Sequence, residues 1–366
     1  MIEERLLTQE ESAIYSLRAL YRNRGYLPFK MSRFEEYEYY LRNKDFLDSD
    51  RIISFTDVNG RLMALKPDVT LSIIKNGEDD PGCIQRVCYD EKVYRPAGTG
   101  REFREIAQTG IECIGQLGEY ELYEVLLLAA NSLKLLSEEY VLNVSHLGIL
   151  SALLDGCSND EGFRREVERL LSEKNLHELR SLCRRFGIAP ASEERLIACA
   201  ALNCPLPDAV AELRRLGCDA AALKELDALS LLLAAGSCSS HIRFDFSVVN
   251  NMHYYSGIVF AGYIEGVHNT LLSGGRYDHL MRKLGRSADA IGFALYLNRL
   301  EELPDRSGET DVETLILYND AVSTAELSAA AERLRSAGKS FSIQRKIPAG
   351  LRYAEILDFR GEAESC

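Results

Sequence analysis

Polar and charged side chains recur on one face of a predicted strand, which reads Arg104-Glu105-Ile106-Ala107-Gln108-Thr109-Gly110-Ile111-Glu112. Side chains alternate between the two faces of a β-strand, so Arg104, Gln108 and Glu112 point the same way. Apolar residues flank this row, and buried polar groups cost free energy unless they meet a partner. A small polar ligand would be such a partner. The run therefore predicts a sheet that presents a binding surface to a small molecule.

Length and composition allow a large core, because the chain has 366 residues of which 46% are hydrophobic. A chain of this length is expected to form two or three domains. No apolar run is long enough to span a bilayer, and the charged N-terminus lacks a signal-peptide pattern. We therefore expect a soluble, cytoplasmic protein without a membrane partner.

The ten cysteines are scattered and form no Cys-x-x-Cys pair. This spacing favours free thiols in a reducing compartment over a zinc or disulfide framework. Neither a metal ion nor a cofactor is expected.

The net charge of −13 argues against a protein that binds polyanions unaided. Arginine pairs do recur at Arg164-Arg165, Arg184-Arg185 and Arg214-Arg215. Each pair lies among glutamates in an amphipathic helical pattern, which favours a solvated helix face. Contact with nucleic acid is the alternative interpretation.

The order of periodic segments predicts an α+β fold with antiparallel strands. The expected elements of the core are a helix over Glu10–Arg24, a hairpin of Arg51–Thr56 and Arg61–Lys66, an antiparallel pair of Gln85–Arg95 and Phe103–Gly115, a helix over Tyr120–Leu136, and strands over His241–Val249, Tyr254–Tyr263 and Thr270–Leu272. Between these elements, His146–Ala235 is almost purely helical and leucine-rich. That segment is typical of an inserted helical module.

Three parts are predicted from this organisation: a core of residues 1–144 plus 239–304, a helical insertion of residues 145–238, and a unit of residues 311–366. The last part has the pattern of a small α/β unit. Its expected elements are strands over Val312–Tyr318, Phe341–Arg345 and Tyr353–Phe359 and a helix over Ala325–Ala337. It is only a fragment of a normal domain.

Four segments, in order, resemble the catalytic core of class II aminoacyl-tRNA synthetases, and the closest similarity is to histidyl-tRNA synthetase. LKPDVT (Leu65–Thr70) resembles the LRPEGT segment, and Val93–Gly115 resembles motif 2. NNMHYYSGIVF (Asn250–Phe260) resembles the histidine-specific RGLDYYTGTVFE segment, and Ser273–Leu300 resembles motif 3. The similarity covers residues 1–300 apart from the helical insertion. It implies a class II antiparallel sheet flanked by helices.

The resemblance implies a histidine site in which the amino-acid side is intact. The residues implied for it are Asp68 and Thr70 at the ammonium group, Gln108 and Glu112 at the ammonium and imidazole, and Tyr255 and Tyr277 around the imidazole. Carboxylates and phenol hydroxyls match the donors of histidine, although they would also accept other small cationic amino acids. Adjacent Tyr254 and Tyr255 should face opposite sides of a strand, so we expect only one of them to line the pocket. The alternative is a polar strand face with core tyrosines.

On the nucleotide side the resemblance implies losses. Arg95 and Arg299 stand at the motif 2 and motif 3 arginine positions, but the catalytic arginine falls on Asn250. Loss of one such cationic group costs about 10³-fold or more in rate. A glycine under the adenine falls on Tyr296, whose ring would fill the space of the base, and a nearby glutamate falls on Asn298.

Further departures are the loop Pro96-Ala97-Gly98-Thr99, which lacks the family's Glu and Arg, and Ser32 in place of the motif 1 proline, although Glu35 is kept. Only residues 311–366 stand where the family has a full anticodon-binding domain, so binding of tRNA is not expected.

A synthetase relative with these losses resembles the regulatory subunits of short-form ATP phosphoribosyltransferase. The resemblance implies a non-catalytic, histidine-binding chain that assembles with a separate catalytic subunit and mediates feedback control of the first step of histidine biosynthesis. It also implies a homodimer, through Glu10–Tyr40, within a larger hetero-oligomer. Two alternatives are a divergent active histidyl-tRNA synthetase and an amino-acid-sensing domain that serves another partner.

Overall fold

The computed structural model describes residues 7–47, 52–77, 80, 82–96, 102–236, 238–249, 254–303 and 310–360. The chain divides into two compact units, Met1–Glu302 and Leu303–Cys366. The first unit contains both the predicted core and the predicted helical insertion. The fold class is α+β, as expected from the sequence.

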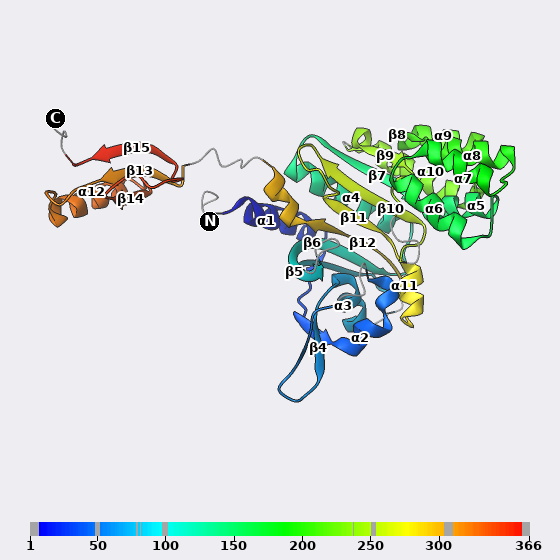
Figure 1. The fold of residues 1–366 in the computed structure, drawn as a ribbon, viewed down its shortest axis with the longest axis horizontal. Helices are drawn as coiled ribbons and strands as arrows, with labels where there is room; N and C mark the ends of the chain where they lie inside the picture. Colours follow the sequence, from blue (N-terminus) through cyan, green and yellow to red (C-terminus); the bar gives the residue numbers. More distant parts are fainter. Residues whose placement is uncertain are drawn as a thin grey trace. The chain divides into compact units, whose positions relative to one another are not determined.

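A nine-stranded sheet forms the centre of the first unit (Figure 1). Its strand order is β1 (Leu27–Pro28), β5 (Gln85–Pro96), β6 (Phe103–Gly115), β12 (Asp289–Tyr296), β11 (Leu272–Arg276), β10 (Ile258–Ile264), β7 (Tyr140–His146), β9 (Ile242–Asp245) and β8 (Asn203–Pro205). Adjacent strands from β5 to β7 are antiparallel to each other, whereas β1 pairs parallel with β5 and β9 pairs parallel with β7. In this register Glu112 lies opposite Gly292, and Gln108 lies opposite Tyr296.

Helices α1 (Gln9–Arg22) and α4 (Glu119–Leu136) pack against one face of this sheet. Ala13, Leu17 and Tyr21 lie on the buried side of α1, at the i, i+4 spacing of an amphipathic helix. The Tyr21 ring is 6.0 Å from the ring of Phe293 on β12, and its hydroxyl is 3.0 Å from the Ser132 hydroxyl on α4. Helices α1 and α4 therefore cover this face of the sheet.

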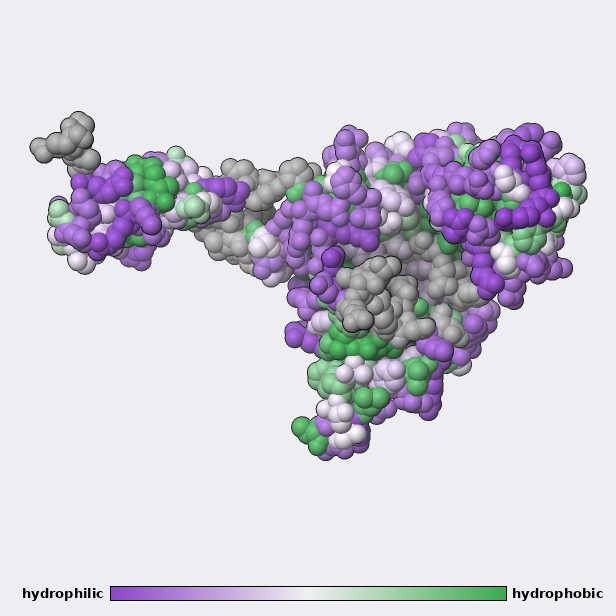
Figure 2. All heavy atoms as spheres, in the orientation of Figure 1, coloured by the Kyte–Doolittle hydropathy of each residue, from purple (hydrophilic) through white to green (hydrophobic). Residues whose placement is uncertain are grey.

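Against the opposite face lie a small sheet and three short helices. The elements are β2 (Phe34–Glu36), β4 (Leu62–Leu65) and β3 (Ser54–Thr56), in that strand order, with α2 (Tyr37–Arg42), α3 (Val69–Asn76) and α11 (Asp278–Lys283). The fully buried Lys66 donates to Glu91 on β5 at 2.7 Å, so one ion pair joins the hairpin to the main sheet. Figure 2 shows hydrophobic residues on the hairpin that β3 and β4 form. The ring of Phe34 on β2 packs against the ring of Phe55 on β3, and Val58 in the turn between β3 and β4 is fully exposed.

Six helices follow β7 and gather beside β7 and β9 (Figure 1). They are α5 (Leu147–Asp155), α6 (Glu161–Ser172), α7 (Leu176–Arg185), α8 (Pro190–Ala200), α9 (Leu206–Arg215) and α10 (Ala220–Ala234), and we call them the helical module. The sequence pattern missed that β8, between α8 and α9, pairs antiparallel with β9. The module therefore supplies the edge strand of the main sheet.

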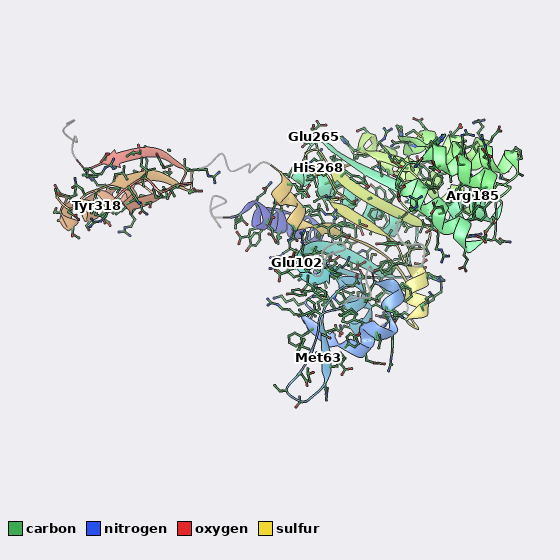
Figure 3. The ribbon with its side chains drawn as sticks, in the orientation of Figure 1. Met63, Glu102, Arg185, Glu265, His268 and Tyr318 are labelled. Atoms are coloured by element: carbon green, nitrogen blue, oxygen red, sulfur yellow. The ribbon has the colours of Figure 1, made fainter. Side chains whose placement is uncertain are left out.

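Each arginine pair of the module has at least one member that contacts an acid, and all of these arginines except Arg164 are exposed. Arg214 donates to Asp227 at 2.9 Å, and Arg164 contacts Asp155. Arg185, labelled in Figure 3, is an exposed residue of the helical module. The contacts with acids favour a solvated surface over one that binds nucleic acid.

The second unit is a parallel three-stranded sheet with one described helix. Its strands are β14 (Phe341–Gln344), β13 (Val312–Leu317) and β15 (Tyr353–Asp358), in that order, and its helix is α12 (Thr324–Ser336). Ala330 and Leu334 of α12 pack against Ile316 of β13. The predicted elements of this small α/β unit are confirmed.

Three predicted strands have the wrong bounds. The strand expected from Tyr254 begins at Ile258, the strand expected over Thr270–Leu272 covers Leu272–Arg276, and the strand expected over His241–Val249 covers only Ile242–Asp245. Short 3₁₀ turns at Ser239–His241, Lys44–Phe46 and Leu297–Glu302 complete the described elements. In the described part of the chain no helix is long and apolar enough to cross a bilayer.

Candidate functional site

A cavity of about 300 Å³ opens on the sheet face opposite α1 and α4. It is lined by all six residues predicted to bind histidine, which are Asp68, Thr70, Gln108, Glu112, Tyr255 and Tyr277. Strands β6, β12 and β11 form its floor, the first turn of α3 forms one wall, and tyrosines form the others. Its size lies at the lower end of the range of about 300–1,000 Å³ for small-molecule sites.

Glu112 is the centre of the hydrogen bonding in this cavity, and its side chain is only 2% exposed. The Tyr277 hydroxyl donates to Oε2 at 2.6 Å, and the Thr70 hydroxyl donates to Oε1 at 2.7 Å. Burial, with a smaller contribution from the nearby Asp68, raises the pKa of Glu112 to about 8 in spite of the lowering effect of the two hydroxyls. A carboxyl group with this pKa is mostly protonated at neutral pH.

Gly292 on β12 makes room for that carboxyl group. A Cβ atom at this position would lie 1.7 Å from Oε2 of Glu112, which no side chain can tolerate. Gly110 on β6 makes room for the side chain of Tyr89 in the same way, because a Cβ atom on Gly110 would lie 2.6 Å from the Tyr89 hydroxyl. Glycines within strands often mark such close approaches, so Gly110 is the sequence signal that could have identified Tyr89 as a cavity residue.

The Gln108 side chain is 3% exposed and lines the cavity. Its amide has no hydrogen-bond partner among the residues that the structure describes. The amide faces the cavity and is not a fully buried, unsatisfied group, so a ligand can bond to it in place of solvent. Gln108 can donate to a ligand and accept from it.

Tyr254 and Tyr255 both line the cavity, which corrects the prediction that only one of them would. That prediction assumed a strand, but β10 begins only at Ile258 and residues 254–257 form an irregular segment. The two rings lie 4.6 Å apart, and the Tyr254 ring lies 5.9 Å from that of Tyr277. The three rings form an aromatic wall that suits a flat, partly apolar group.

Asp68 is engaged by protein groups. It caps α3, since Oδ1 accepts from the Leu71 amide at 2.8 Å, and Oδ2 lies 3.2 Å from Nη2 of Arg95. Arg95 also donates from Nε to the Pro67 carbonyl at 2.7 Å. The predicted ammonium ligand and the predicted nucleotide arginine thus form an ion pair with each other.

Arg299 and Tyr296 also contact each other. The guanidinium carbon of Arg299 lies 4.8 Å from the centroid of the Tyr296 ring, and Tyr296 lines the cavity whereas Arg299 does not. Asn298 accepts from the Ala107 amide through Oδ1 at 2.5 Å, so it ties the turn after β12 to β6. Asn250 and the loop residues 97–101 lie outside the described residues.

Arg104, the first member of the predicted polar row, is exposed and does not line the cavity. Gln108 and Glu112, further along the same strand, do. The described residues contain no group of three or more His, Cys, Asp or Glu side chains that could hold a metal ion. The buried carboxyl group, the amide and the phenol rings of the cavity suit a small polar molecule with a cationic or proton-accepting group.

Comparisons with known proteins give a consistent picture. The family model of histidyl-tRNA synthetase matches residues 3–300. A relative named ATP phosphoribosyltransferase regulatory subunit, from Oceanobacillus iheyensis, is 28% identical over 329 residues, which is 87% of this chain and 80% of the relative.

Two solved structures are also similar. A structure titled as an ATP phosphoribosyltransferase regulatory subunit/histidyl-tRNA synthetase, from Bacillus halodurans, has a TM-score of 0.72 at 26% identity and covers 97% of this chain and 94% of its own. A chain of the HisG:HisZ ATP phosphoribosyl transferase complex from Thermotoga maritima has a TM-score of 0.63 at 18% identity, with 78% of this chain and 96% of that chain covered. The second similarity, at its low identity, shows the fold alone.

Proposed function

This chain belongs to the histidyl-tRNA synthetase family, and on that premise we propose that it is a non-catalytic, histidine-binding regulatory subunit of ATP phosphoribosyltransferase. The observation that carries the proposal is a contrast within one cavity. Groups that suit histidine are gathered around Glu112, whereas Tyr296 and Arg299 contact each other where the family resemblance places a nucleotide.

Histidine suits the Glu112 end of the cavity because its imidazole can take the proton that Glu112 holds. The pair then becomes a carboxylate and an imidazolium, in which the ionic attraction and the hydrogen bond act together. The Tyr277 and Thr70 hydroxyls already donate to the carboxyl oxygens and would stabilise the ionised form. The Gln108 amide and the tyrosine wall supply a polar contact and a flat apolar surface.

Three features of the nucleotide side argue against activation of histidine. Arg95 is paired with Asp68, and Arg299 lies over Tyr296, so both guanidinium groups have partners within the protein. Asn250 is neutral and cannot balance the charge that develops on an α-phosphate. We therefore propose that the ability to form an aminoacyl adenylate has been lost.

The partner is proposed from the names of the relatives. Those names describe regulatory subunits of ATP phosphoribosyltransferase, so the proposed partner is the catalytic subunit of the short-form enzyme. Histidine would exert feedback control if it binds one arrangement of the complex better than another, by a coupling of about 1–3 kcal/mol. A homodimer within this hetero-oligomer is part of the proposal.

Reconstitution tests this function. The purified chain is mixed with the short-form catalytic chain from the same genome, and condensation of ATP with phosphoribosyl pyrophosphate is measured with and without histidine. We expect activity to require this chain and to fall as histidine is added. Activity that is independent of this chain would contradict the proposal.

Two further measurements separate the alternatives. Robust histidine-dependent exchange of pyrophosphate into ATP by the isolated chain would identify an active synthetase. A stable complex in the native host with a different enzyme, and none with the catalytic chain, would identify an amino-acid-sensing domain for another partner.

A further inference from the structure

A cluster of polar side chains packs around the backbone at the end of the tyrosine wall and joins the helical module to the main sheet. Its members are His146 at the end of β7, Glu225 on α10 and Arg276 at the end of β11. Oε1 of Glu225 lies 3.3 Å from Nε2 of His146, and Oε2 accepts from Nη1 of Arg276 at 3.3 Å. Glu225 on the module therefore contacts the ends of both strands.

These three side chains surround Gly257, the last residue of the irregular segment that carries Tyr254 and Tyr255. Gly257 has a φ of +77°, a conformation that favours glycine. A Cβ atom there would lie 3.8 Å from Oε1 of Glu225, 3.8 Å from Cδ of Arg276 and 4.0 Å from Nε2 of His146. The cluster thus packs closely around the backbone that ends the tyrosine wall.

Backbone hydrogen bonds connect the same segment to the same two strands. The Ser256 amide donates to the Arg276 carbonyl at 2.7 Å, and the Leu147 amide donates to the Gly257 carbonyl at 2.7 Å. Leu147 directly follows His146 and begins α5. The positions of Tyr254 and Tyr255 therefore depend on how β7, α5 and β11 are held together.

The imidazole of His146 is fixed in orientation. Its Nδ1 accepts from the Ile149 amide at 3.4 Å, as the N-cap of α5, so in the neutral ring the proton is on Nε2 and is donated to Glu225. Gly148 permits this cap, because a Cβ atom at that position would lie 2.9 Å from Cε1 of the imidazole. Loss of Glu225 would leave this donor without its acceptor.

Arg276 links the cluster to the ligand cavity. It donates from Nε to Asp278 at 2.6 Å and from Nη2 to Asp289 at 3.3 Å, in addition to Glu225. The next residue, Tyr277, carries the hydroxyl that donates to Glu112. Gly275, the residue before Arg276, contacts the ring of Tyr255. A Cβ atom on Gly275 would lie 2.8 Å from Cδ1 of Tyr255.

We propose that Glu225 is a positioning residue, through which the helical module holds the Tyr254–Tyr255 wall in the geometry that binds histidine. The inference rests on the proposed histidine site and assigns the module a role in it. Without Glu225, the segment of residues 254–257 would sample other positions. Binding would then have to order it, and the ordering free energy lowers affinity.

Calorimetric titration of L-histidine into the full chain tests the role of Glu225. We expect Glu225→Ala to weaken binding by about fivefold or more, which is a coupling of about 1 kcal/mol. Glu225→Gln, which keeps the volume and one hydrogen-bond acceptor, should weaken it less. The matched control is Asp227→Ala on the same helix, because Asp227 contacts Arg214 at the surface and its side chain is 44% exposed. This control should bind histidine as the wild type does.

A double-mutant cycle separates positioning from a general loss of stability. If Glu225 acts through the tyrosine wall, Glu225→Ala should cost much less affinity when Tyr255→Leu is already present. Thermal unfolding of each variant shows whether it is folded, and Glu225→Gln replaces Glu225→Ala if the latter is not.

Unchanged affinity in the Glu225 variants, with a wild type that binds histidine, would overturn this inference and leave the proposed function intact. If Glu225→Ala lowered the affinity equally in the presence and absence of Tyr255→Leu, the inference would be overturned as well, because Glu225 would then not act through the tyrosine wall. A wild type that does not bind histidine would overturn the proposed function, and this inference with it.

Discussion

The guanidinium group of Arg299 lies over the ring of Tyr296, with its central carbon 4.8 Å from the ring centroid. Such a cation–π contact contributes about 0.5–2 kcal/mol, depending on solvent exposure. The family resemblance places the adenine of ATP beside this arginine. We propose that the Tyr296 ring occupies that position, so that the cavity accepts an amino acid and not a purine nucleotide.

The first prediction concerns nucleotide binding. We expect the isolated chain to bind ATP with a dissociation constant well above the micromolar range, and Tyr296→Gly to bind it more tightly because the variant frees both the space and the Arg299 surface. Titration of ATP monitored by calorimetry measures both constants. Tyr120→Ala, which removes a half-exposed tyrosine from α4, serves as the control. Micromolar affinity in the wild type would contradict the prediction.

Glu112 should dominate the affinity for histidine. We expect Glu112→Ala to weaken histidine binding by more than about tenfold, because a cationic ligand would lose its charged partner in a buried site. Glu105→Ala on the same strand is the control, since Glu105 contacts Lys92 and its side chain is 44% exposed. If calorimetry gave the same affinity for Glu112→Ala and the wild type, Glu112 would not be a histidine-binding residue.

The stability of the empty protein should depend on pH through Glu112. Its pKa rises from 4.5 to about 8 on folding, so between these values the folded protein keeps a proton that the unfolded chain has released. The free energy of unfolding should therefore fall as the pH rises through this window, by up to about 1.4 kcal/mol per pH unit. Urea unfolding of the wild type and Glu112→Gln at several pH values measures the difference. Parallel pH profiles for the two proteins would show that Glu112 does not titrate in this way.

Histidine affinity should be greatest in a plateau between two titrations. A free imidazole has a pKa of about 6.5, and that of Glu112 in the empty cavity is about 8. If the bound pair shares one proton, binding releases a proton below the plateau and takes one up above it. Calorimetry in buffers of different ionisation enthalpy detects both exchanges. An affinity that keeps rising above pH 8 would contradict a carboxylate–imidazolium pair.

The buried ion pair between Lys66 and Glu91 should matter for stability. Lys66→Ala leaves Glu91 without its 2.7 Å partner, and breaking such a pair costs about 3–5 kcal/mol. Lys92→Ala removes an exposed pair with Glu105 and should cost less than about 1 kcal/mol. Chemical denaturation compares the two variants, and equal losses would show that burial of Lys66 has no special role.

Local pattern was sufficient for much of the fold. The two long strands β5 and β6, the helix α4 and the small α/β unit at the C-terminal end all follow from periodicity and turn residues. The strand β8 could not be found this way, because three residues that pair with a distant edge carry no periodic signal of their own. The irregular segment at Tyr254 and Tyr255 could not be recognised either, because tyrosines favour strands and these two lead directly into β10.

The sequence by itself determined that Gln108 and Glu112 share one face of a strand, because alternation is a property of the backbone. It also identified the family through the order of its motifs. Only the tertiary structure decided that Arg95 is paired with Asp68, that Arg104 lies outside the cavity and that the Glu112 carboxyl group is protonated near neutral pH. These properties depend on burial and on distances between residues far apart in the chain, and neither is set until the sheet and its helices have packed together.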